Sequence, residues 1–248
     1  MGWRLGWTTR LLPVLVLLAG WEVAAHLIGS RLFPPLSIVM AALLREAASG
    51  QLERQLGITL LRVACAFTVA MVLGTALGVA MGRWRWLDRA LDSLLTALLN
   101  LPALVGIVLI YVWFGLSEAT AIAAVALNKL PSTAVTLREG ARALDEGLID
   151  MARSFRMGRG AILRHVVLPQ LYPYLFGAAR SGLALIWKIV LVAELLGRSD
   201  GVGFQIQVYF QLFDVTGILA YTLAFIVVVQ LIEWLALQPL ERRANRWR

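Results

Sequence analysis

Long apolar runs follow one another along this 248-residue chain, separated by short stretches in which the charged residues gather. A helix needs about 20 predominantly apolar residues to cross the hydrocarbon core of a bilayer. By that measure the pattern predicts about six membrane-crossing helices, near 11–28, 58–82, 91–116, 118–137, 171–197 and 217–238. Only a turn at Ser117-Glu118 separates the third run from the fourth, so these two form a helical hairpin. The expected fold is an all-α polytopic membrane protein.

The first two segments of the chain need a separate interpretation. Leu11 to Ile28 could be the core of a cleaved signal peptide, but such cores span about 7–15 residues. Trp21-Glu22 also interrupts the end of this run, which favours an uncleaved first span. The segment 33–56 begins with Pro34-Pro35 and carries charges among apolar residues at helical spacing. It is too polar to span, so we expect an interfacial helix there.

Composition supports a membrane protein, and the placement of the charged residues predicts its orientation in the membrane. The chain is 60% hydrophobic and 15% charged, with a mean hydropathy of +0.77, whereas soluble domains are about 25% charged. The net charge of +8 does not indicate nucleic-acid binding, because the cations lie between apolar runs and at the termini. Cytoplasmic segments of membrane proteins carry the excess of Lys and Arg.

With the N-terminus inside, the cytoplasmic segments hold fifteen arginines and the opposite side holds four. The fifteen are Arg4, Arg10, Arg83, Arg85, Arg89, Arg138, Arg142, Arg153, Arg156, Arg159, Arg164, Arg242, Arg243, Arg246 and Arg248, against Arg31, Arg45, Arg54 and Arg198. This bias predicts a bacterial inner-membrane protein with both termini and the loop 138–170 in the cytoplasm. Trp84 and Trp86 alternate with two of these arginines, as is typical of anchors at headgroup depth.

Small residues recur at one-turn spacing in the second run. Gly74, Gly78 and Gly82 lie four residues apart, with Ala70 one turn earlier. Such a stripe allows the backbone of another helix to approach closely. We therefore expect a tightly packed helix contact along this face.

The cytoplasmic loop is predicted to contain two short helices that meet at a corner. Asp145 to Phe155 has apolar residues at 148, 151, 152 and 155, a helical stripe. The sequence Arg-Met-Gly-Arg-Gly at 156–160 breaks it, and a second helix is expected over 161–167, ended by Leu168-Pro169. The corner would present Phe155 together with Met157 and several arginines.

The spacing of this loop resembles the "EAA" loop of ATP-binding-cassette import permeases, which reads E-A-A, three residues, G, nine residues, I-x-L-P. Asp150-Met151-Ala152 occupies the triplet, Arg156 the glycine position, and Val166 to Pro169 the end, in register. Asp, Met and Arg replace the usual Glu, Ala and Gly. Since that glycine normally provides the corner, we expect Gly158 to take over the turn, because glycine adopts a positive φ at little cost.

The resemblance extends over most of the chain, to the nitrate/sulfonate/taurine/bicarbonate permease group. That group's "WE" is similar to Trp21-Glu22, and its "SLxRV" to Thr59–Val63. Its "IP…WFGxGE" is similar to Pro102 with Trp113–Glu118, and its "GLR…AW…AE" to Arg180 with Trp187 and Ala193-Glu194. Its "GIGY" is similar to Gly201–Phe204. Val108 replaces a proline usual in that group, and Lys188 is not expected after the tryptophan. These departures lie in the membrane region and leave the solute open.

The resemblance implies a permease that a separate ATPase drives, since the chain has no G-x-x-x-x-G-K-[ST] nucleotide motif. It implies two cytoplasmic ATPase subunits with ATP bound there, a second copy of the permease, and a periplasmic substrate-binding protein. The expected organisation is a first unit over 1–57, a permease core over 58–240 containing the loop, and a basic tail over 241–248. The residues expected to couple to the ATPase are Asp150, Met151, Ala152, Arg153, Phe155, Arg156, Met157 and Gly158. The alternative for Phe155 is that it packs beneath its own helix bundle.

Charged and polar residues inside spans predict a translocation pathway, because they are costly in a membrane and by default functional. The candidates are Lys188, Lys129, Asn100 and Glu194. Two lysines favour an anionic solute such as nitrate, a sulfonate or bicarbonate. The alternatives are a structural ion pair for Lys188 and snorkelling to the interface for Lys129.

Other functional classes fit the sequence less well. A secondary transporter, the main alternative, would be expected to show matching helix breaks in two halves, and Pro102 and Pro131 do not match in this way. No catalytic constellation is present, so an enzyme is not expected. The isolated His26 and His165 have no second ligand at metal spacing, and no cofactor is expected on this chain.

Overall fold

In the computed structural model, the chain is described over residues 8–237, with side chains over 12–235. This part is helical, and no strand occurs within it. The helices are α1 Thr8–Ile28, α2 Leu36–Ala48, α3 Gln51–Arg83, α4 Arg85–Asn100, α5 Ala103–Phe114, α6 Glu118–Arg142, α7 Glu146–Ser154, α8 Arg159–Ile162, α9 Leu168–Gly197, α10 Val202–Gln211 and α11 Val215–Ile232. Two π-helical turns follow α8 and α11, at Leu163–Val167 and Glu233–Leu237. The tail 241–248 lies outside the described residues.

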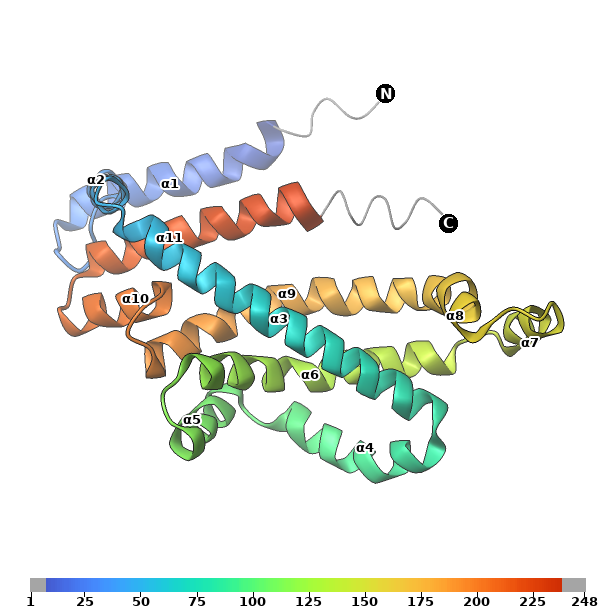
Figure 1. Ribbon diagram of the computed structural model, residues 1–248. Coiled ribbons are helices and arrows are strands. Elements are labelled where there is room, and N and C mark those ends of the chain that lie inside the picture. The colour runs from blue at the N-terminus through green and yellow to red at the C-terminus, as the bar shows by residue number, and fades with distance from the viewer. Residues whose placement is uncertain (1–7, 238–248) are drawn as a thin grey trace.

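The long helices run between two ends of the molecule (Figure 1). The short helices α2 and α10 group at one end, called the α10 end here, while α7 and α8 lie at the other, the α7 end. Three helices within the described residues are long and apolar enough to cross a membrane, namely Gln51–Arg83, Arg159–Gly197 and Val215–Leu235. The α4–α5 pair would make a fourth if it forms one broken span. The all-α polytopic class is confirmed, while the count of six crossings stays a prediction.

The third predicted span, 91–116, is wrong as a single helix. It consists of parts of α4 and α5, which are bent by 103° at a break over Leu101 and Pro102. Leu101 is extended, with φ −72° and ψ 121°, because the proline ring disfavours a helical residue before it. Hydropathy continues across this break, which is why the apolar run alone does not show it.

Two further boundaries differ from expectation. The segment 33–56 is not one interfacial helix, because Gly50 turns the chain at φ +75° and residues 51–56 begin the long α3. Leu168-Pro169 does not end a short helix, because the helical path runs without a break from Arg159 to Gly197. The π turn absorbs the proline: the N–H of Leu168 donates to the carbonyl of Leu163, five residues back.

The predicted small-residue stripe is the contact between α3 and α6. A Cβ placed on Gly78 would lie 2.3 Å from the carbonyl oxygen of Ala134, and one on Gly82 would lie 2.6 Å from the Cβ of Ala141. Real Cβ atoms do not approach other atoms so closely, so only glycine lets the two backbones meet. This contact connects the loop-bearing helix α6 rigidly to α3, and the prediction of a tight packing face is confirmed.

Candidate functional site

The loop at the α7 end forms a corner built on the short helix α7. Asp145 caps this helix, accepting hydrogen bonds from the N–H groups of Gly147 and Leu148 at 2.8 and 3.3 Å. Ile149 and Ala152 are buried and hold one face of α7 against the bundle, where Ile149 packs in a cluster with Leu171. The helix is therefore fixed in orientation by a cap at its start and an apolar face beneath it.

The opposite face of α7 is an exposed apolar ridge, made up of Leu148, Met151 and Phe155. Their exposed fractions are 41%, 53% and 78%. An exposed aromatic at this level contradicts the alternative that Phe155 packs beneath its own bundle. A group of exposed apolar side chains of this kind marks an interaction site. The predicted stripe thus divides, with Ala152 facing inward and Met151 and Phe155 facing outward.

The turn after α7 is made by Arg156, and the expectation that Gly158 makes it is wrong. Arg156 has φ +55°, while Gly158 is extended at φ −65°. The N–H of Arg156 donates to the carbonyl of Arg153 at 2.8 Å, and that of Met157 to the carbonyl of Ala152 at 3.1 Å. These two bonds form a Schellman motif, whose left-handed position is usually glycine. Arg156 therefore takes the left-handed position that usually carries glycine in this motif, at a cost in backbone strain.

Cations flank the ridge. Asp150, the only acid within residues 147–158, pairs with Arg153 at 2.9 Å, so its charge is balanced within the helix. Arg156 is exposed beside it. Glu146, at the start of α7, pairs with Arg83 of α3 at 3.0 Å, which ties the corner to the helix behind it. The corner therefore offers an apolar ridge with a basic rim.

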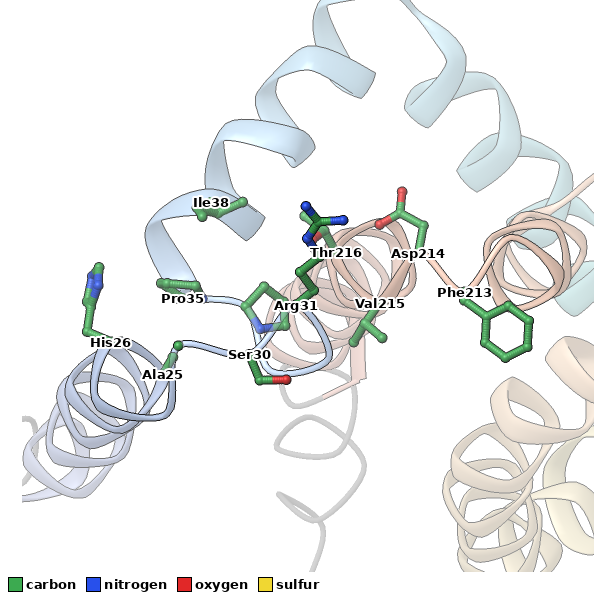
Figure 2. A pocket seen from close by; sticks show the side chains of 12 residues that line it. Ala25, His26, Ser30, Arg31, Pro35, Ile38, Phe213, Asp214, Val215 and Thr216 are labelled. Atoms are coloured by element: carbon green, nitrogen blue, oxygen red, sulfur yellow. The ribbon is translucent and has the colours of Figure 1, made fainter.

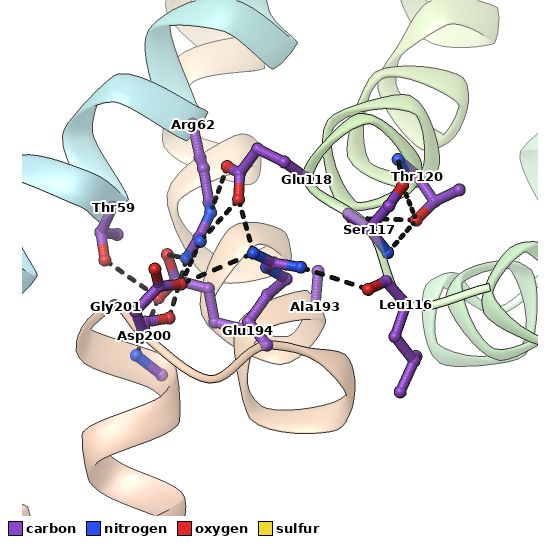
Figure 3. Close-up of polar contacts among 12 residues, drawn as sticks. Thr59, Arg62, Leu116, Ser117, Glu118, Thr120, Ala193, Glu194, Asp200 and Gly201 are labelled. Carbon is purple, nitrogen blue, oxygen red and sulfur yellow. Dashed lines mark hydrogen bonds and ion pairs between the residues drawn. The ribbon is translucent and has the colours of Figure 1, made fainter.

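A cluster of charges around the buried Arg62 and Glu194 occupies the α10 end (Figure 3). Arg62 of α3 is 3% exposed and donates to both carboxylate oxygens of Glu118, at 2.7 and 2.8 Å. The same guanidinium bonds Glu194 at 2.8 Å and pairs with Asp200. Bidentate arginine–carboxylate pairs are among the strongest hydrogen bonds in proteins. One arginine thus joins α3, α6, α9 and the turn before α10.

Glu194 is fully buried within this cluster. Its carboxylate accepts from the hydroxyl of Thr59 at 2.9 Å and from the N–H of Gly203 at 2.8 Å. A Cβ on Gly201 would lie 2.4 Å from the carboxyl carbon, so the glycine turn is required for this approach. The sequence places Arg62, Glu118 and Glu194 in separate motifs, up to 132 residues apart, and no local spacing indicates that they meet.

The four predicted pathway residues do not form one site. Lys129 is 2% exposed and donates to the hydroxyl of Ser132 at 2.8 Å, with its stem against Gly182 of α9. Lys188 is exposed on α9. Asn100 donates to the carbonyl of Thr96 at the end of α4, and Glu194 belongs to the cluster around Arg62. Within the described residues, no hydrogen bond or ion pair joins any two of the four.

A separate hollow of about 490 Å³ lies at the α10 end, between the α1–α2 turn and the start of α11. Figure 2 shows Arg31 and Asp214 extending to the same side of it from these two segments. Nearby, Trp21 donates to the carbonyl of Pro34 at 3.1 Å, and Glu22 accepts from the hydroxyl of Ser37 at 2.7 Å. The Trp-Glu pair of the first helix therefore holds this turn in place. None of the predicted pathway residues lines the hollow.

Helices long enough to span a bilayer, a rigid helical corner at one end and an internal charge cluster at the other define the membrane-embedded subunit of a transporter. The chain belongs to the family of binding-protein-dependent transport system inner membrane components, whose model matches residues 70–243. It is thus the permease subunit of an ATP-binding-cassette importer, and not an enzyme itself. An importer of this family works with an ATPase and a substrate-binding protein.

Curated relatives and solved structures agree with this assignment. The chain is 30% identical over 203 residues to the aliphatic sulfonates transport permease protein SsuC of Escherichia coli (strain K12), covering 80% of this chain and 77% of the relative. It is 28% identical to the taurine transport system permease protein TauC of the same strain, over 92% and 84% of the two chains. A chain of an inward-facing MetNI methionine ABC transporter shares the fold with a TM-score of 0.67, at 20% identity, over 81% and 99%.

Proposed function

We propose that two copies of this chain form the membrane pathway of an importer for a small anionic solute. The observation that carries the proposal is Lys188, a cation exposed on the spanning helix α9. It has no carboxylate within ion-pair distance among residues 12–235, which argues against a structural ion pair within the chain. A lysine that faced lipid at this depth would be costly. It therefore faces a partner copy or the pathway between the copies.

Two further facts support an anionic solute. Lys129 is a second cation in the membrane region without a carboxylate partner among the described side chains, since its bond is to the hydroxyl of Ser132. Relatives carry names that refer to aliphatic sulfonates, taurine, bicarbonate and nitrate transport. Uncompensated positive charge along α6 and α9 favours an anionic solute electrostatically. Asn100, at the break between α4 and α5, and Glu194, near the end of α9, keep a lesser part in the proposal.

In the same proposal, the ridge of Leu148, Met151 and Phe155 inserts into a groove of the ATPase, with Met157 and Gly158 at its edge. The ATPase binds the ATP, and this chain binds no cofactor. The α7 end then faces the cytoplasm together with both termini, as the excess of arginines at that end favours. Residues 1–57 form an accessory unit, the permease core runs over 58–240 with the loop 138–170, and 241–248 is a basic tail.

Substitution of Lys188 tests the solute class. In proteoliposomes containing the full importer, Lys188→Met is expected to lower uptake of the cognate anion about tenfold or more, because a favourable charge of roughly 1.4 kcal/mol is lost. Lys188→Arg keeps the charge and should retain most of the uptake. Anion uptake unaffected by Lys188→Met would overturn the pathway role, whereas loss in both variants with intact assembly would indicate a purely steric one.

A further inference from the structure

A second hollow, of about 570 Å³, lies at the α7 end between the α3–α4 corner and the junction of α6 and α7. Its lining is strongly basic. Four arginines face it against two carboxylates, and the charged lining residues are Arg83, Arg85, Arg89, Arg142, Asp88 and Glu146. A concave surface with this excess of cations is suited to an anion.

Two of the four arginines are neutralised within the protein and two are not. Arg83 pairs with Glu146 at 3.0 Å, and Arg142 pairs with Asp88. Arg85 and Arg89 are exposed, and neither has a carboxylate within ion-pair distance in the part of the chain whose side chains are described. The hollow therefore holds two guanidinium groups one helical turn apart that lack an anionic partner.

The position of the hollow identifies the surface that it meets. It lies where α3, a helix long enough to span the bilayer, ends at Arg83. Trp84 and Trp86 follow at once and are 57% and 66% exposed. Exposed tryptophans next to arginines at the end of a span are typical of headgroup depth. Basic hollows between transmembrane helices at this depth bind the headgroups of anionic lipids.

We infer that this hollow binds the phosphate of an anionic phospholipid, such as phosphatidylglycerol, through Arg85 and Arg89. The inference rests on the orientation in the proposed function, which places the α7 end at the cytoplasmic leaflet. Trp84 and Trp86 then lie beside the glycerol and upper acyl chain of the bound lipid. Because Arg83 reaches both the hollow and Glu146, the lipid sits at the base of the helix that carries the coupling ridge.

Lipid retention by the full-length chain tests this site without any transport assay. The chain is purified in detergent, titrated with phosphatidylglycerol, and the retained lipid is counted by native mass spectrometry. The double variant Arg85→Gln/Arg89→Gln is expected to bind this lipid about 25-fold more weakly, since each cation near an anionic surface contributes about fivefold. Arg45→Gln/Arg54→Gln removes the same charge from exposed positions at the α10 end and is expected to bind as the unmodified chain does.

Three outcomes would overturn the inference. Equal loss of lipid in both double variants would show a nonspecific charge effect. Unchanged lipid retention with weakened binding of the ATPase would make the hollow a protein contact. Displacement of the lipid by millimolar inorganic phosphate would identify a soluble phosphate as the occupant. Because retention is measured on the isolated chain, failure here leaves the importer assignment intact, and failure of anion uptake leaves the lipid result intact.

Discussion

At the α7 end Phe155 exposes 78% of its surface, whereas at the α10 end Arg62 exposes 3%. An apolar side chain is thus left in the open at one end, and a charge is enclosed at the other, the reverse of the usual distribution. The ridge around Phe155 leaves much of its apolar surface exposed within the chain, as the proposed contact with the ATPase would require. Arg62 already has carboxylate partners from three other segments of the same chain, α6, α9 and the turn before α10.

The two ends thus differ in role. The ridge is a surface for interaction, whereas the Arg62 cluster holds helices of the same chain together, as a clamp. A buried ion pair is weak evidence for stability by itself, but breaking one half leaves an uncompensated charge. An exposed apolar ridge contributes little to the stability of its own chain, but dominates an interface once it is enclosed. Substitutions at the two ends should therefore affect different quantities, stability at Arg62 and assembly at Phe155.

The largest effect is expected from Arg62→Met. Glu194 would stay buried without its counter-ion, and the free energy of unfolding should fall by about 3–5 kcal/mol. Unfolding of the full chain in mixed micelles, followed by circular dichroism, measures this. Arg54→Met removes an exposed arginine from the same helix and should change stability by no more than about 0.5 kcal/mol. A similar small change for Arg62→Met would show that the cluster is not a clamp.

The next effect is expected from Phe155→Ala on assembly. Loss of an enclosed aromatic anchor typically costs about 2 kcal/mol of binding, or roughly thirtyfold in the dissociation constant for the ATPase. The stability of the isolated chain should change little. Phe213→Ala is the matched control, because Phe213 is an 80% exposed aromatic at the α10 end. Equal weakening by the two variants would remove the distinction between the ends.

The smallest effect concerns the strained turn. Arg156→Gly relieves the left-handed conformation, partly offset by the greater freedom of glycine in the unfolded chain, for a net gain of about 0.5–1 kcal/mol. Amide exchange over 152–157 should slow about two- to fivefold. Gly158→Ala should leave exchange nearly unchanged, because Gly158 has φ −65° and open space where a Cβ would lie. Faster exchange in Arg156→Gly would mean that the arginine side chain stabilises the corner.

Much of the fold is predictable from the sequence, because spans and small-residue stripes are local patterns. The α3–α6 contact at Gly78 is confirmed, and α5 and α6 are joined by the short turn expected next to Glu118, at residues 115–117. Pro102 was named as a helix break, but the 103° bend that divides 91–116 into two helices was not predicted, since hydropathy is averaged over a window longer than the break. The continuity of 159–197 past Pro169 was missed too, because a π turn removes the clash that a proline causes in a regular helix.

The candidate site was predicted in part, for a similar reason. The corner follows from a motif of fixed spacing, so its residues could be named. The resemblance put the turn at position 156, but the arginine there led us to expect it at Gly158, whereas the structure makes the turn at Arg156. The Arg62 cluster joins residues far apart in sequence. Each partner taken alone would be interpreted as a helix cap or as part of a local motif. Only the packing of α3 against α6 and α9 brings them together.

The most direct test of the account is solute-dependent ATP hydrolysis, measured together with solute uptake in proteoliposomes that contain the complete importer. With saturating ATPase subunit, Phe155→Ala should lose most of the uptake and most of the stimulation of ATP hydrolysis by loaded binding protein. Phe213→Ala should retain the ratio of uptake to hydrolysis. Full coupling in the Phe155→Ala importer would contradict the claim that this corner transmits the work of the ATPase to the membrane helices.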